Sequence, residues 1–144
     1  MKRNLGLSGL VLLAVFTAIQ FVPVSRSNPP VTGDIPAPPE IKTLLKNACY
    51  DCHSHESVWP SYSRVAPISW LIANDVKEGR GKMNVSKWSD YRPTKQGMLL
   101  DDAAEQIQQG EMPPFQYRLM HPAERLTEAQ KQVLTHWMKS VVAE

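Results

Sequence analysis

The sequence has few cysteines, little net charge and no pattern typical of a β-sheet. Only two of its 144 residues are cysteine, so the second pair of ligands that a zinc finger needs is absent. The formal net charge is +2, too small for the dense basic stripe that binds nucleic acid. No alternating apolar and polar run and no internal repeat occurs. These absences leave one small helical domain as the expected architecture.

The N-terminal segment has the features of a targeting signal. Lys2 and Arg3 precede residues 5–24, which carry no charge, and a membrane-spanning helix needs about 20 such residues. By the positive-inside rule, the remaining chain would lie outside the cytoplasm. We predict a domain on the periplasmic side of the bacterial inner membrane, anchored by residues 5–24. The alternative is a cleaved signal peptide and a soluble periplasmic protein.

Proline divides the chain into three parts. Twelve prolines exceed seven glycines, and proline favours extended backbone. We therefore expect residues 1–24 to be the signal or anchor helix and residues 25–38 to be a proline-rich linker. The folded domain is expected over residues 39–144. The linker is interpreted as a semi-rigid stalk, or alternatively as an extension that wraps the domain.

Helical spacing of apolar residues predicts four helices in the domain. The first covers about residues 39–49, and the second begins near residues 66–67 and ends at Gly79 and Gly81. The third runs from Thr94 towards a stop at Gly110. The last begins after Thr127, which forms a capping box with Gln130. The last helix presents one apolar stripe, formed by Val133, Leu134, Trp137, Met138 and Val141.

The segment Cys49-Tyr50-Asp51-Cys52-His53 carries the main chemical signal. Two thiols separated by two residues can reach the two vinyl groups of one porphyrin, and the following imidazole can bind its iron. The pattern predicts one covalently attached haem c per chain, with His53 as an axial ligand. Three alternatives remain: a redox disulfide, a structural disulfide, and a zinc site that also uses His55.

A second axial ligand is expected from a loop near the last helix. Met112 follows Gly110 and precedes two prolines that stiffen the backbone, so we expect it to bind the iron opposite His53. His121 or a vacant position is the alternative. Further cofactor contacts are predicted for three aromatic residues and one propionate-binding cation: Trp59, Tyr62, Trp70 and Arg64. Each of these has an ordinary alternative, as part of the aromatic core or as an exposed arginine.

The sequence resembles the bacterial haem-binding domain family from about residue 28 to the C-terminus. The residues that carry the resemblance are Asn47-Ala48-Cys49-Tyr50-Asp51-Cys52-His53-Ser54-His55-Glu56, Trp59-Pro60, Tyr62, Ala66-Pro67-Ile68-Ser69-Trp70-Leu71, Asp75-Val76, Gly79-Arg80, Gly110-Glu111-Met112-Pro113, Tyr117, His121-Pro122 and Leu126. The resemblance implies an all-α, cytochrome c-like domain around one haem, with Met112 at the family's Met-Pro position.

Two functions are compatible with such a haem. Electron transfer is expected when His53 and Met112 both bind the iron, with redox proteins of a respiratory or periplasmic chain as partners. A haem enzyme or ligand sensor is the alternative, and it requires an open or displaceable sixth position. No distal acid–base pair is evident in the sequence, so we expect an electron carrier and not an enzyme.

Overall fold

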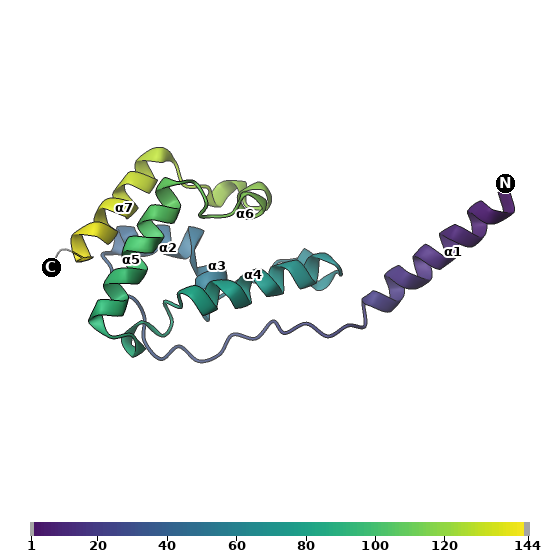
Figure 1. Ribbon diagram of the computed structural model, residues 1–144, viewed down its shortest axis with the longest axis horizontal. Coiled ribbons are helices and arrows are strands. Elements are labelled where there is room, and N and C mark those ends of the chain that lie inside the picture. Colours follow the sequence, from purple (N-terminus) through teal and green to yellow (C-terminus); the bar gives the residue numbers. More distant parts are fainter. Residues whose placement is uncertain (1, 143–144) are drawn as a thin grey trace.

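The computed structural model describes residues 2–142. All named secondary-structure elements in this part of the chain are helices (Figure 1). The α-helices are α1 Lys2–Ile19, α2 Pro39–Ala48, α3 Tyr50–His53, α4 Ile68–Lys82, α5 Pro93–Gln108, α6 Phe115–Met120 and α7 Glu128–Val142. Three short 3₁₀ helices accompany them: η1 Ser61–Arg64, η2 Trp88–Asp90 and η3 Pro122–Glu124. Within residues 2–142, β structure is limited to one isolated bridge, Gly33 with Lys87. The predicted all-α class is confirmed.

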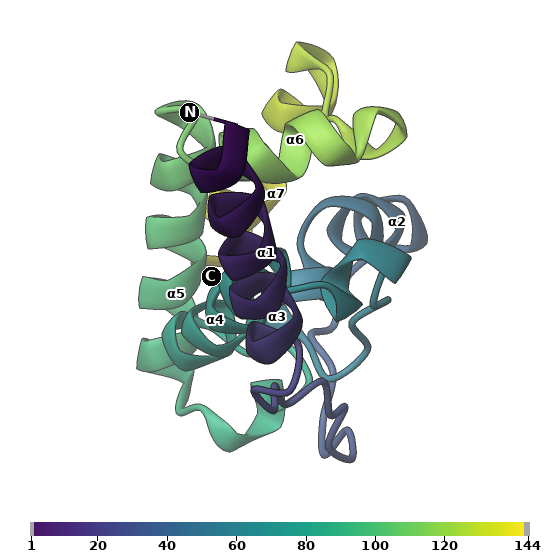
Figure 2. The same cartoon turned by 90° about the vertical axis from the view of Figure 1, so that its right-hand side faces the viewer.

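The core of the domain lies where α5 and α7 pack together and α2 covers them. Figure 1 shows α5 and α7 side by side. Leu100 of α5, Leu134 and Met138 of α7 and Leu45 of α2 are almost completely buried. Burying such side chains stabilises the fold by about 1.5–3 kcal/mol each. Figure 2 shows α6 at one end of this group of helices.

The predicted start of the last helix is confirmed in atomic detail. The Thr127 N–H donates to Oε1 of Gln130 at 2.8 Å, and the Gln130 N–H donates to Oγ1 of Thr127 at 3.2 Å. These bonds satisfy backbone donors that a helix N-terminus leaves free. The predicted apolar stripe is only partly right, because Val133 and Val141 are exposed.

Helix α1 extends away from the domain (Figure 1), and its C-terminal end is attached to it. The Gln20 side chain accepts a hydrogen bond from the Ala66 N–H at 2.9 Å and donates to the Ala66 carbonyl at 3.2 Å. Within residues 2–142, no helix combines the length and apolar character needed to cross a membrane.

The proline-rich segment lies along the domain and is bonded to it. Arg26 donates to the Ser63 carbonyl at 3.3 Å, and Asn28 donates to the Ser57 carbonyl at 3.0 Å. The N–H groups of Thr32 and Gly33 both bond to the Ser86 carbonyl. An extended backbone has no internal hydrogen bonds, so its polar groups find partners on the domain. Residues 26–33 therefore form an extension that wraps the domain, which was the second of the two interpretations of this segment.

Helix α4 continues through both glycines that were expected to end it, and stops at Lys82. The reason lies at Gly79, where α4 packs directly on the backbone of Cys52. A Cβ atom at residue 79 would lie 2.6 Å from the Cys52 carbonyl oxygen, which is closer than van der Waals contact allows. Gly79 therefore permits a close approach between helices and does not terminate one.

We expect Gly79→Ala to destabilise the domain by about 1–3 kcal/mol, because the new methyl group forces α4 away from α3. The measurement is urea unfolding followed by circular dichroism. Gly81→Ala in the same helix is the matched control, since a Cβ there meets nothing within 4 Å. The control should be neutral or stabilising by up to about 1 kcal/mol. Equal unfolding midpoints for the two variants would contradict the close packing.

Candidate functional site

Cys49 joins α2 to α3, and Cys52 and His53 lie in the short helix α3, so all three belong to one tight turn of the chain. Helix α2 ends at Ala48, and Cys49 has φ −125°, so the chain changes direction before α3 starts at Tyr50. The Cys49 N–H bonds to the Leu45 carbonyl, and the His53 N–H bonds to the Cys49 carbonyl, both at 2.9 Å. Both cysteines are free and partly exposed. The turn thus presents two thiols and one imidazole within five residues.

Both thiols are protonated at neutral pH. Burial, followed by the neighbouring Cys52, raises the pKa of Cys49 to about 12. Burial, followed by the carboxylates of Asp51 and Asp75, raises the pKa of Cys52 to about 11. A redox-active cysteine pair needs an accessible thiolate. These environments therefore disfavour the redox disulfide.

The His53 ring is held in one orientation and one tautomer. Its Nδ1 lies 3.0 Å from the Met83 carbonyl oxygen, and a carbonyl can only accept, so Nδ1 carries the proton. Burial lowers the pKa of His53, although its hydrogen bonds to backbone carbonyls oppose the effect. The ring is therefore neutral near pH 7, with the Nε2 lone pair free. Metal-binding histidines are oriented by this kind of bond to the other nitrogen.

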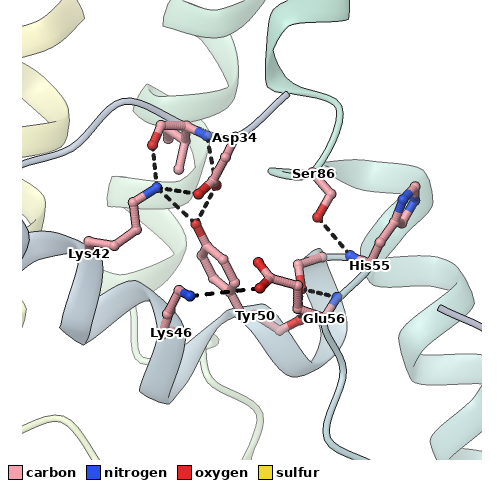
Figure 3. Close-up of polar contacts among 9 residues, drawn as sticks. Asp34, Lys42, Lys46, Tyr50, His55, Glu56 and Ser86 are labelled. Carbon is pink, nitrogen blue, oxygen red and sulfur yellow. Dashed lines mark hydrogen bonds and ion pairs between the residues drawn. The ribbon is translucent and has the colours of Figure 1, made fainter. Parts of the chain in front are cut away.

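The second histidine of the motif region has a structural role. His55 donates from Nδ1 to the Pro30 carbonyl at 2.9 Å, and its Nε2 accepts from the Asn84 amide at 2.8 Å. Its backbone N–H bonds to Oγ of Ser86, as Figure 3 shows. Both ring nitrogens are thus engaged away from the cysteines. A zinc site that includes His55 would have to break two buried hydrogen bonds.

Tyr50, the first residue between the cysteines, points into the domain. Its hydroxyl donates to Oδ1 of Asp34 at 2.6 Å, and Lys42 bonds to both side chains (Figure 3). Burial tends to raise the pKa of Asp34, but the hydrogen bonds from Lys42 and Tyr50 outweigh it and the pKa is lowered. The Asp34 carboxylate is therefore ionised at neutral pH and ties Tyr50 to the N-terminal segment.

Arg80 joins three parts of the chain just behind the turn. Its Nε donates to the Ser54 carbonyl at 2.7 Å, and one Nη donates to the Ser27 carbonyl at 2.9 Å. The other Nη donates to Oδ1 of Asn28 at 2.8 Å and to Oγ of Ser57 at 3.0 Å. A planar guanidinium can make these bonds in several directions at once. Arg80 thus fixes the segment after His53 to α4 and to the proline-rich segment.

Asp51, the second residue between the cysteines, connects the turn to α6. Its Oδ1 accepts from the Val58 N–H at 2.8 Å, and its Oδ2 lies 3.0 Å from the Tyr117 hydroxyl. Tyr117 also bonds to Oε2 of Glu124 at 2.6 Å. The motif did not indicate these partners, because Tyr117 is 66 residues from Asp51. The available sequence signal for these contacts was that Tyr117 and His121-Pro122 are among the residues shared with the family.

Tyr62 belongs to the same polar group. Its hydroxyl lies 2.6 Å from Nε2 of His121, and Nδ1 of His121 lies 2.8 Å from Oε2 of Glu124. The Tyr117 ring stacks on the His121 ring with centroids 4.3 Å apart. Since both nitrogens of His121 are hydrogen bonded, it could bind iron only after leaving this cluster. Asp51, His121 and Glu124 also have the spacing of a possible metal site, but two such carboxylates are common without an ion.

The other predicted site residues lie in different surroundings. Met112 is partly buried against the core, whereas Arg64 is exposed. Trp59 and Trp70 line one groove of about 540 Å³ with residues of the proline-rich segment. Trp70 is nine residues from Gly79, which places it on the face of α4 opposite Cys52. The indole N–H groups of Trp59 and Trp70 are buried without a partner in the described part of the chain. The haem contacts expected of these four residues stay predictions.

The donor set fits a haem. Two neutral thiols and one neutral imidazole with a free Nε2 lie on one turn, which is what two thioether bonds and one axial bond require. Apolar side chains also remain exposed on helices α4 and α6. They are Ile68, Leu71, Phe115, Leu119 and Met120. Exposed apolar surface of this kind is typical of a place that another group covers.

Fold and site together define a small all-helical domain suited to haem. A family model described as a haem-binding domain matches residues 14–140, so the chain belongs to this haem-binding family. No curated protein and no solved structure matches the chain. The matched residues include the Cys49–His53 motif, Arg80 and its partners, and the Tyr62–His121 cluster.

We expect Arg80→Lys to lower the free energy of unfolding by about 1–3 kcal/mol, because an ammonium group cannot keep all four guanidinium hydrogen bonds. Urea unfolding of the full chain measures this. Lys77→Ala, an exposed change on the same helix, should stay within about 0.5 kcal/mol of the parent. An Arg80→Lys variant as stable as the Lys77→Ala variant would show that the cluster carries little stability.

Proposed function

We propose that the chain is a c-type monohaem cytochrome that transfers electrons outside the cytoplasm. Cys49 and Cys52 would hold the porphyrin through two thioether bonds, and His53 would bind the iron through Nε2. The observation that carries the proposal is the His53 ring. It is neutral, fixed at Nδ1 by the Met83 carbonyl, and free at Nε2 beside two protonated thiols.

Met112 is the proposed sixth ligand. Its loop is held by backbone bonds, since the N–H groups of Glu111 and Met112 both donate to the Gln106 carbonyl. Gly110 adopts φ 78° to end α5, a conformation that favours glycine. Arg118 donates to the Gly110 carbonyl at 3.1 Å and restrains the loop from the other side. A loop with few degrees of freedom can keep a weak thioether ligand in place at little entropic cost.

When bound, haem iron supplies a centre that gains and loses one electron. The chain's residues would hold the ligand atoms in one geometry in both oxidation states, and a thioether opposite an imidazole raises the potential. The Met83 carbonyl keeps the His53 ring from rotating, and Gly79 keeps α4 close to Cys52. These restraints favour electron exchange, because little rearrangement accompanies it.

The alternative is a haem enzyme or ligand sensor with an open or displaceable sixth position. It would need an acid–base group that can reach the iron's open side. His121, the imidazole considered above as another iron ligand, has hydrogen bonds at both of its nitrogens. Electron transfer is the better supported function.

The proposed location follows from the N-terminus. Lys2 and Arg3 precede an uncharged run over residues 5–24, an arrangement typical of export signals. The segment would either remain as an anchor or be removed, and the domain would then meet redox partners of a respiratory or periplasmic chain.

Covalent attachment is tested with cysteine variants co-expressed with haem-maturation proteins. We expect the parent chain to keep a haem-dependent stain on a denaturing gel, and Cys49→Ala/Cys52→Ala to lose it completely. Cys52→Ala alone should lose one thioether and shift the absorption band of its pyridine haemochrome. His136→Ala, an exposed change in α7, is the control and should stain like the parent. Stain that survives the double substitution would overturn the proposal.

The sixth ligand is tested by absorption spectroscopy. We expect the oxidised protein to show a methionine-to-iron charge-transfer band that disappears in Met112→Ala, and the reduction potential to fall because the thioether is lost. Met120→Ala, at an exposed methionine of α6, should keep both the band and the potential. Rapid carbon monoxide binding by the reduced parent protein would instead indicate an open sixth position.

A further inference from the structure

Acidic residues are missing from two separate stretches of the sequence. All fourteen aspartate and glutamate residues lie within residues 34–56 and 75–144, so residues 1–33 and 57–74 contain none. The same two stretches do contain basic residues, which are Lys2, Arg3, Arg26 and Arg64. A surface built from both stretches would therefore have a positive potential, although the net charge of the whole chain is small.

The structure brings these two stretches together. The Gln20 side chain is bonded to both backbone polar groups of Ala66, at 2.9 and 3.2 Å. Arg26 donates to the Ser63 carbonyl at 3.3 Å. Figure 1 shows that α1 leaves the domain at the N-terminal end of α4. We define the tip of the domain as residues 20–26 and 57–66, which these contacts join.

The surface of the tip combines apolar and basic side chains. Phe21 is 81% exposed and Val58 is 76% exposed, and Val65 is exposed as well. The side chains of Arg26 and Arg64 are also exposed. Among the described residues, neither arginine forms an ion pair with a carboxylate. The tip thus offers two cations and protruding apolar groups to whatever lies against it.

Two carboxylates reach the tip from other segments, and both already have partners. Asp51 accepts from the Val58 N–H at 2.8 Å and lies 3.0 Å from the Tyr117 hydroxyl. Glu124 bonds to Tyr117 and to Nδ1 of His121. Because Tyr117 belongs to α6, these negative charges lie on the side of the tip that faces α6. They do not neutralise Arg26 or Arg64 by direct contact.

We propose that the tip docks on the surface of an anionic phospholipid membrane. Arg26 and Arg64 lie against the headgroup phosphates, and Phe21 and Val58 enter the boundary between headgroups and acyl chains. Binding of a protein surface to such a boundary strengthens with the buried apolar area and with electrostatic attraction to anionic lipid. The tip has groups for both contributions.

Helix α1 favours a lipid surface over an acidic protein as the partner. It exposes apolar side chains from Leu7 to Phe16 and carries no charge after Arg3. A helix that is apolar on all sides belongs in apolar surroundings. Since the tip is bonded to the C-terminal end of α1, lipid that receives this helix also meets the tip. The docking rests on the proposed location outside the cytoplasm, but it does not depend on the haem.

The test is hydrogen–deuterium exchange of the full chain with its haem, bound to lipid vesicles. One set of vesicles is pure dioleoylphosphatidylcholine, and the other contains equal parts of this lipid and dioleoylphosphatidylglycerol. We expect the amides of residues 57–66 to exchange several-fold more slowly on the anionic vesicles than on the neutral ones. Exchange in α7 should be the same on both. High salt should remove the difference, because it screens exposed charges.

Charge-reversal variants connect the effect to the tip. Arg64→Glu should lose most of the slower exchange on anionic vesicles. Lys139→Glu, the same change at an exposed position of α7, is the matched control and should keep it. Val58→Asp adds a carboxylate at an exposed apolar position and should also lose the effect. This second variant keeps the proposal testable if Arg64→Glu does not fold or does not retain haem.

Equal exchange of residues 57–66 on the two kinds of vesicle would overturn the proposal, and so would slower exchange that survives both tip variants. A tip that is unaffected by lipid but exchanges more slowly with added poly-L-glutamate would also overturn it and would identify an acidic protein as the partner. Flotation of the chain with vesicles reports the contribution of α1, and haem staining of the same samples reports the proposed attachment. Failure of the proposed function is therefore distinguished from failure of the docking.

Discussion

The hydrogen bond from Nδ1 of His53 to the Met83 carbonyl is the contact on which the site depends. It selects the tautomer, orients the ring and leaves Nε2 free. The bond requires that the residue after α4 lies beside the turn, and this in turn requires the close approach of Gly79 to Cys52. A small residue 26 positions beyond His53 in the sequence thus helps to decide whether an imidazole can bind iron.

Sequence periodicity was enough to predict the large helices and the class of the fold. Helices α2, α5 and α7 begin within a residue of their expected positions, because proline or a capping threonine marks each start. Helix α6 was not predicted, since Phe115–Met120 is only six residues long and its apolar side chains form no buried stripe. The extension of α4 through Gly79 was also missed, because the packing that needs a glycine there involves a residue far away in sequence.

The site was predictable only as far as its chemistry is local. Cys49, Cys52 and His53 are neighbours, so their spacing alone indicated haem. The roles of Arg80, Tyr117 and Glu124 depend on contacts between distant segments, which no spacing rule reveals. His55 illustrates the difference, because its position beside the motif suggested a ligand, whereas the structure directs it to Pro30 and Asn84.

The two residues between the cysteines have separate structural roles and are not simple spacers. Tyr50 points to Asp34 in the N-terminal segment, and Asp51 points to Tyr117 on α6. The turn is therefore tied on one side to the segment that follows α1 and on the other to the helix that follows the Met112 loop. A displacement of Asp34 or of Tyr117 would therefore move the short peptide between the two thiols. The environment of a haem bound there would consequently depend on the positions of both segments. The Tyr62 cluster belongs to the connection with α6.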